Sequence, residues 1–169
     1  PAGPSEVLVI ADKTGNPEYI AADLLSQAEH GADSQVILLS DCENILTQTL
    51  IQLEKQVLLL PRSETAKKAL SNSKAFLLNN MEDCMDFSNL YAPEHLIIAS
   101  NDASKYIDKV INAGSVFLGN YSCESAGDYA SGTNHTLPTN GYARNYSGVS
   151  LDSFQKKITF QKISKEGIQ

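Results

Sequence analysis

The sequence contains neither a long apolar segment nor a cysteine pattern typical of disulfide-rich proteins. Its apolar runs are five residues or fewer, whereas a membrane-spanning helix needs about 20. Its three cysteines, Cys42, Cys84 and Cys123, are an odd number and show neither CxxC nor CxxxC spacing. We therefore expect no membrane partner, no disulfide framework and no zinc finger, and we expect a reducing, cytoplasmic location.

Positive charge is also scarce. The 13 lysines and arginines are outnumbered by 20 aspartates and glutamates, the formal net charge is −7, and no basic cluster occurs. Because nucleic-acid binding depends on basic side chains that neutralise phosphates, we expect no nucleic-acid partner. The first apolar run is not followed by G-x-G-x-x-G, and G-x-x-x-x-G-K-S/T does not occur. The sequence therefore indicates no nucleotide-phosphate site of its own.

Short apolar segments alternate with amphipathic ones over the first 118 residues. Continuous apolar runs are typical of strands buried on both faces, and they predict strands at 6–11, 35–39, 75–78, 96–99 and 116–118. Helices are predicted at 19–30, at 45–60, from 63 onward, at 81–91 and at 101–113. This order predicts one α/β domain over residues 1–169, Rossmann-like and doubly wound, with a mostly parallel five-stranded sheet.

The C-terminal part departs from this alternation. After a polar loop, residues 151–157 predict a short helix and residues 159–163 an edge strand. At one end Pro1 leads into the first strand almost at once, and at the other a helix capped by Ser164 stops before it begins. We therefore expect the chain to be a fragment of a longer protein.

The polar loop within residues 114–138 is the strongest candidate for a functional segment. Two acids and a histidine lie there among glycines, serines and threonines: Glu124, Asp128 and His135. Such a segment buries little apolar surface, so packing alone does not offset the entropy lost when it is ordered. A solvated surface loop is the alternative, but Gly127, Gly132 and Pro138 restrict the backbone where a floppy loop would not need it.

Gln27 and His30 are three residues apart on a predicted helix, so they share one face near its C-terminal end. For an isolated Q-x-x-H the plainer interpretation is a surface pair. With a carboxylate from elsewhere, the same spacing could form half of a zinc or manganese site. Asp128 could supply that carboxylate, although the three residues would leave the shell one ligand short.

Glu94 and His95 directly precede a buried strand. Side by side, a carboxylate and an imidazole offer a base and an acid near neutral pH. The alternative, equally supported by these residues alone, is a helix-to-strand connection in which His95 bonds a carbonyl. Cys123 lies beside acidic Glu124, which disfavours a reactive thiolate, so we interpret it as a packing residue.

Six blocks of sequence carry a resemblance to a known family: residues 3–12, 23–31, 91–96, 113–119, 124–139 and 154–156. In this order they resemble the C-terminal half of histidinol dehydrogenases, with Cys123 where the family commonly has proline. The resemblance implies oxidation of L-histidinol to L-histidine through L-histidinaldehyde, the last steps of histidine biosynthesis. It also implies two NAD⁺ used in succession, one zinc ion, and a homodimer in the full-length enzyme.

The resemblance also implies roles for individual residues. Gln27, His30 and Asp128 match zinc ligands, with a further histidine supplied by the partner subunit. Glu94 and His95 match the catalytic acid–base pair. The positions that match substrate contacts are Ser5, Gln27, His30, Glu94, Asp128 and His135.

The family's NAD⁺ contacts lie mostly in an earlier domain that this chain lacks. We therefore expect the isolated chain to fold but to have little or no dehydrogenase activity. A non-catalytic scaffold or metal-binding fragment is the main alternative. An unrelated metal-dependent hydrolase is a third, which no feature of the sequence requires.

Overall fold

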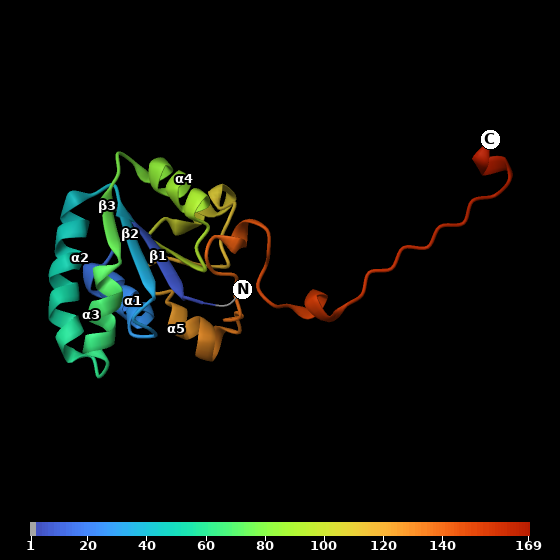
Figure 1. Cartoon of the computed structure of the whole chain (residues 1–169). Coiled ribbons are helices and arrows are strands. Elements are labelled where there is room, and N and C mark those ends of the chain that lie inside the picture. The colour runs from blue at the N-terminus through green and yellow to red at the C-terminus, as the bar shows by residue number, and fades with distance from the viewer. Residues whose placement is uncertain (1–2) are drawn as a thin grey trace.

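A five-stranded parallel β-sheet forms the centre of the structure, a computed structural model that describes residues 3–169 (Figure 1). The strands are β1 (Glu6–Ala11), β2 (Gln35–Ser40), β3 (Lys74–Leu77), β4 (His95–Ala99) and β5 (Ser115–Leu118). They lie in the order β3-β2-β1-β4-β5, and every neighbouring pair is parallel. The predicted doubly wound α/β fold is therefore confirmed.

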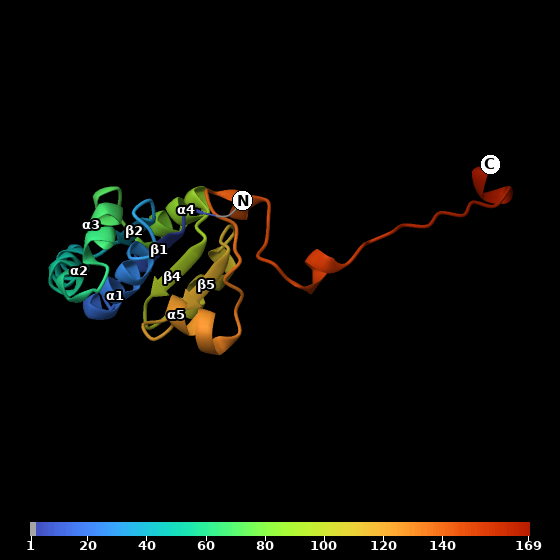
Figure 2. The same cartoon turned by 60° about the horizontal axis from the view of Figure 1, so that its bottom comes forward.

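Helices cover both faces of this sheet (Figures 1 and 2). One face carries α1 (Pro17–Ala28), α2 (Glu43–Gln56) and α3 (Ser63–Ser71), and the other carries α4 (Met81–Tyr91) and the 3₁₀ helix Ala103–Lys109. Alternate residues of β1 explain the division, because Val7 and Val9 join the first core whereas Leu8 and Ile10 join the second. Both faces of the strand are thus buried, which accounts for its continuous apolar run.

The connection from α4 to β4 fixes where Glu94 lies. The helix ends at Ala92, which adopts a left-handed conformation (φ 57°) and donates its N–H to the Ser88 carbonyl. The start of β5 then lies against the Glu94 backbone, because the Ser115 N–H donates to the Glu94 carbonyl at 2.9 Å. A Cβ on Gly114 would come within 2.5 Å of that oxygen. Glycine at position 114 therefore permits this close approach.

Part of the predicted polar loop is helical. After β5 the chain forms α5 (Glu124–Ala126), which continues into the π-helical turn Gly127–Ser131. A Cβ on Gly127 would meet a ring carbon of Phe117 at 2.9 Å and the Thr133 hydroxyl at 2.5 Å. The turn is thus packed closely beside β5, with no room for a larger residue at 127.

Three of the predicted elements, two helices and one strand, differ from the structure. The predicted helix at 101–113 is the shorter 3₁₀ helix Ala103–Lys109, and that at 151–157 is the 3₁₀ turn Leu151–Phe154. The predicted edge strand at 159–163 is wrong, because these residues pair with no strand among residues 3–169. They belong to a segment that runs away from the sheet in both views, where Phe160 is 92% exposed (Figures 1 and 2).

Within the described residues, no helix has both the length and the apolar character needed to cross a membrane.

Candidate functional site

Buried polar side chains gather at the amino ends of β1 and β4. Val7 pairs with His95 in the sheet, so Glu6 lies beside Glu94 at the same edge. All three polar residues, Glu6, Glu94 and His95, are buried. Ligands of doubly wound folds commonly bind at the carboxyl edge, beyond the strand ends. The candidate site instead lies at the amino edge of the sheet. The C-terminal end of α1 and the segment after β5 both reach this edge.

The backbone of Glu6 holds the Glu94–His95 pair. Its N–H donates to Glu94 Oε2 at 2.9 Å, and its carbonyl accepts from His95 Nδ1 at 3.2 Å. Because a carbonyl oxygen only accepts, Nδ1 carries the proton and the lone pair is on Nε2. The two interpretations from sequence are therefore compatible, since His95 bonds a carbonyl and still presents a base.

Burial shifts both members of the pair toward their neutral forms. It raises the pKa of Glu94 to about 7, with a further increase from the nearby carboxylates of Glu6 and Asp128. It lowers the pKa of His95 below its ordinary value. The Phe117 ring contributes to this apolar surrounding, with its centroid 6.1 Å from that of His95. At neutral pH the imidazole is therefore uncharged and able to accept a proton.

His30 has one ring nitrogen, Nε2, that is free to bind a metal ion. It lies just beyond the C-terminal end of α1, is exposed, and donates from Nδ1 to the Ser26 carbonyl at 2.7 Å. Its Nε2 therefore carries the free lone pair, which is the arrangement found in histidines that bind metals. The charge of Asp128 raises the pKa of His95, and protonation of His30 would lower it. Both side chains therefore lie within electrostatic reach of His95.

Gln27 joins the same group through Glu124. With its amide oriented to pair donors with acceptors, Gln27 Nε2 donates to both Glu124 oxygens, at 3.0 and 3.1 Å. Burial raises the pKa of Glu124 to about 8, and the charges of Asp128, Glu94 and Asp23 add to the shift. In the part of the chain that the structure describes, no lysine or arginine forms an ion pair with these four carboxylates.

The donor set fits a cation such as zinc. Gln27, His30 and Asp128 offer an amide oxygen, an imidazole nitrogen and a carboxylate oxygen, in a region where acidic side chains lie close enough to raise one another's pKa. Residues 3–169 contain no group of three or more His, Cys, Asp or Glu side chains arranged to hold a metal ion. Of the predicted trio, only His30 and Asp128 belong to these residue types. A complete metal site would therefore need the Gln27 amide oxygen and further donors as well.

The remaining predicted residues differ in how they relate to this group. Ser5 directly precedes Glu6, and its carbonyl accepts from the Gln35 N–H at 3.1 Å, so Ser5 lies at the amino edge. His135 is exposed, and no described contact joins it to Glu94 or His95. The structure thus places Asp128 within electrostatic reach of Glu94 and His95, and His30 within reach of His95, whereas Gln27 contacts Glu124.

Sequence reasoning missed the parts played by Glu6 and Glu124. Glu6 acts through its backbone, so its side chain gives little indication of the role, although a buried acid that opens an apolar strand is unusual. Glu124 was noticed within the polar loop but was given no function. The signal available for it was its spacing of four residues from Asp128, which places both on one face of a helical turn.

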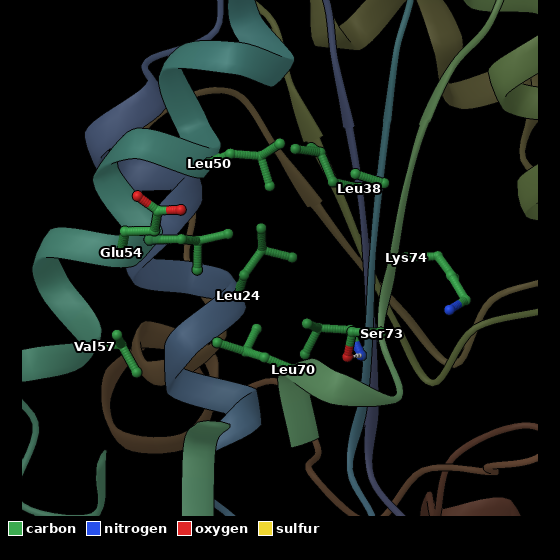
Figure 3. Close-up of a pocket in the computed structure, with 11 residues that line it drawn as sticks. Leu24, Leu38, Leu50, Glu54, Val57, Leu70, Ser73 and Lys74 are labelled. Atoms are coloured by element: carbon green, nitrogen blue, oxygen red, sulfur yellow. Dashed lines mark hydrogen bonds between the residues drawn. The ribbon is translucent and has the colours of Figure 1, made fainter. Parts of the chain in front are cut away.

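An apolar pocket of about 310 Å³ lies elsewhere, between α1, α2 and strands β2 and β3 (Figure 3). Leucines dominate its wall, among them Leu24, Leu38 and Leu50, and the Lys74 side chain points away from it (Figure 3). None of the predicted site residues lines it. Glu54 is the only acidic residue that lines it, and no histidine or cysteine does.

We expect the folded chain to lose stability as pH rises, because the folded-state pKa of Glu94 is raised. This contribution is fully present below the unfolded value of 4.5 and is lost as pH rises through about 7. Between pH 4.5 and 8 we expect a loss of roughly 2–3 kcal/mol in the free energy of unfolding from this group. Urea unfolding followed by circular dichroism, with a chelator present, measures it.

The Glu94→Gln chain should lack this part of the pH dependence, because glutamine does not titrate. Asp86→Asn, at an exposed position on α4, serves as the control and should retain it. Equal pH dependence in the original chain and the Glu94→Gln chain would contradict the burial argument.

Comparisons with known proteins add an independent observation. The family model described as histidinol dehydrogenase matches residues 1–169. A histidinol dehydrogenase of Bacteroides fragilis (strain YCH46) is 58% identical over 168 residues, which cover 99% of this chain and 39% of the relative. One from Haemophilus influenzae (strain 86-028NP) is 55% identical over 169 residues, 100% of this chain and 40% of the relative.

A solved structure is also similar. The crystal structure of histidinol dehydrogenase from Elizabethkingia anophelis matches with a TM-score of 0.94 and 72% sequence identity. The match covers 99% of this chain and 39% of that protein. The chain thus spans about two fifths of the length of the curated and solved relatives described here.

Proposed function

The chain belongs to the histidinol dehydrogenase family, and we propose that it is the zinc- and substrate-binding part of an NAD-dependent enzyme. This enzyme oxidises L-histidinol to L-histidine through L-histidinaldehyde, in the last steps of histidine biosynthesis. The observation that carries the proposal is the buried Glu94–His95 pair, oriented by the Glu6 backbone. Residues 1–169 form one α/β domain of a homodimeric enzyme.

His95 is the base for the first oxidation. Its Nε2 accepts the hydroxyl proton of histidinol while the carbinol carbon loses a hydride, which yields the aldehyde. Bound NAD⁺ supplies the hydride acceptor in both oxidations. The hydrogen bond from Nδ1 to the Glu6 carbonyl orients the ring, and stabilises the imidazolium that forms when Nε2 gains a proton.

Glu94 is the base for the second oxidation. Its carboxylate takes a proton from a water molecule whose oxygen attacks the aldehyde carbon, and the resulting hydrate anion then loses a hydride to give the acid. A carboxylate with a pKa of about 7 is well matched to this task near neutral pH. The Glu6 N–H holds Oε2 and thereby orients the side chain.

Gln27, His30 and Asp128 would hold the zinc ion, with a further ligand from the partner subunit. When bound, zinc supplies an anchor for the imidazole and amino nitrogens of the substrate, which orients the carbinol carbon. Ser5, Glu94 and His135 complete the proposed substrate contacts. The free cysteines Cys42, Cys84 and Cys123 fit the reducing cytoplasm, which we propose as the location.

A direct test uses an exchanged enzyme, in which residues 1–169 of this chain replace the matching segment of full-length Elizabethkingia anophelis histidinol dehydrogenase. We expect it to reduce NAD⁺ with histidinol at rates within tenfold of the parent, because the segment supplies the same pair and ligands. The isolated chain should show little or no NAD⁺ reduction, since it lacks the remaining three fifths of its relatives' length.

A folded exchanged enzyme that binds zinc but oxidises no histidinol would contradict the proposed activity. It would favour the alternative of a non-catalytic metal-binding fragment. Rates from the isolated chain near those of the parent would instead contradict its incompleteness.

A further inference from the structure

Gln27 is an unusual ligand because its amide has two different ends. Its oxygen can bind a cation, whereas its NH₂ group can only donate hydrogen bonds. The side chain is 1% exposed, so water does not select the orientation. A neighbouring group must therefore ensure that the oxygen, and not the nitrogen, faces the cation.

Glu124 is in the right place to make this selection. Its side chain is buried, and both of its oxygens lie within 3.1 Å of the end of the Gln27 amide. In one amide orientation Gln27 Nε2 donates to both oxygens. In the other, the amide oxygen faces both Glu124 oxygens, which is repulsive when Glu124 is ionised, and the NH₂ group faces only donors.

The fold holds Glu124 firmly against α1. Glu124 opens α5, and Gly127 packs that turn against the Phe117 ring, with no space for a Cβ. The same turn carries Asp128 four residues later, on the same face. One segment therefore delivers a ligand, Asp128, and a group that contacts a second ligand, Gln27.

We propose that Glu124 is a positioning residue that fixes the Gln27 amide with its oxygen presented to the zinc ion. The inference rests on the proposed function, because it takes Gln27 to be a zinc ligand. Accepting two hydrogen bonds from Nε2 orients the amide and also polarises it, which strengthens the oxygen as a donor to a cation. Outer groups that orient metal ligands in this way typically change metal affinity by about 10–100-fold.

A double-mutant cycle on zinc affinity tests the proposal in the exchanged enzyme, by competition with a chelator. We expect Glu124→Ala to weaken zinc binding by about 10–100-fold. In a Gln27→Ala background the same change should have an effect of less than about threefold, because the amide to be oriented is gone. Ser125→Ala, at the exposed neighbouring position, is the matched control and should leave the affinity unchanged.

Glu124→Gln provides a second variant of the same size in case the alanine variant fails to fold. Its amide oxygen can accept one hydrogen bond from Gln27 Nε2, so we expect a smaller loss than with alanine. Co²⁺ in place of zinc gives a spectroscopic reading, since its visible absorption should change in the Glu124 variants. A role for Glu124 in folding alone would not move that absorption in a folded protein.

The outcomes separate the two proposals. Unchanged zinc affinity in Gln27→Ala would contradict the metal site itself. Weaker binding in Gln27→Ala with unchanged binding in a folded Glu124→Ala or Glu124→Gln enzyme would overturn only the positioning role. Equal losses on removing Glu124 with and without Gln27 would also overturn it, because Glu124 would then act independently of the amide.

Discussion

Replacing Asp128 with alanine should remove zinc from the exchanged enzyme and abolish histidinol oxidation. Asp128 is the only carboxylate in the proposed ligand trio, and the other two members, Gln27 and His30, are neutral donors. Its loss should weaken zinc binding by more than the ~100-fold that can follow loss of an outer group. Zinc content of the dialysed protein and the rate of NAD⁺ reduction are the measurements.

Two further variants define the cause of that loss. Asp128→Asn keeps the size of the side chain and one oxygen donor, so it should bind zinc more strongly than Asp128→Ala but less strongly than the original residue. Asp152→Ala removes an exposed acid from the C-terminal segment and should leave zinc bound. Full zinc occupancy in folded Asp128→Ala would show that zinc binds at a site that does not include Asp128.

The elements that sequence predicts well are those whose pattern reflects burial alone. Residues 7–11 are fully buried on both faces of the sheet, and a continuous apolar run is the expected consequence. The start of α1 is equally local, since Pro17 occupies the first turn and the Asn16 side chain accepts from two N–H groups. No distant residue is needed to specify either feature.

The predicted helix at 101–113 fails for a reason outside its own sequence. The Asn89 amide oxygen accepts from the N–H groups of Ile111 and Asn112, and these long-range bonds draw the backbone away from helical geometry. Ile111 is consequently exposed and does not point inward. The periodicity of the segment does not reveal a partner on α4.

The predicted edge strand at 159–163 fails for a related reason. Apolar Ile158 and Phe160 alternate with polar Thr159 and Gln161, which is the period of a strand, but a strand also needs a neighbour. The segment runs away from the sheet, so it pairs with neither of the described edge strands, β3 and β5. An alternating pattern specifies a preference for pairing and does not supply the partner.

The site was predictable as a set of residue types and less so as an arrangement. The Q-x-x-H spacing correctly places Gln27 and His30 near the end of α1, but it does not show that Gln27 is buried and His30 exposed. Nor does it show that Gln27 contacts Glu124, which comes from a segment far along the chain. The role of the Glu6 backbone leaves no sequence signal at all, because every residue except proline has both a backbone N–H and a carbonyl.

Replacing Glu94 with glutamine should separate the two oxidations. Glutamine keeps an oxygen that can accept from the Glu6 N–H, but it cannot take a proton from water. Aldehyde oxidation should therefore slow by about 10²–10⁴-fold, the usual contribution of a general base. Alcohol oxidation, for which His95 is the proposed base, should change by less than about tenfold. Stopped-flow NADH formation from histidinol and from histidinaldehyde measures each step.

His95→Asn is the matching variant for the other base. Its NH₂ group can still donate to the Glu6 carbonyl, so the backbone contact is retained while the Nε2 base is lost. We expect alcohol oxidation to slow by about 10²–10⁴-fold in this enzyme. Equal losses of both oxidations in Glu94→Gln would show that Glu94 only supports the position of His95. Loss confined to the aldehyde step would assign the water to Glu94, because that step alone incorporates a water oxygen into the product.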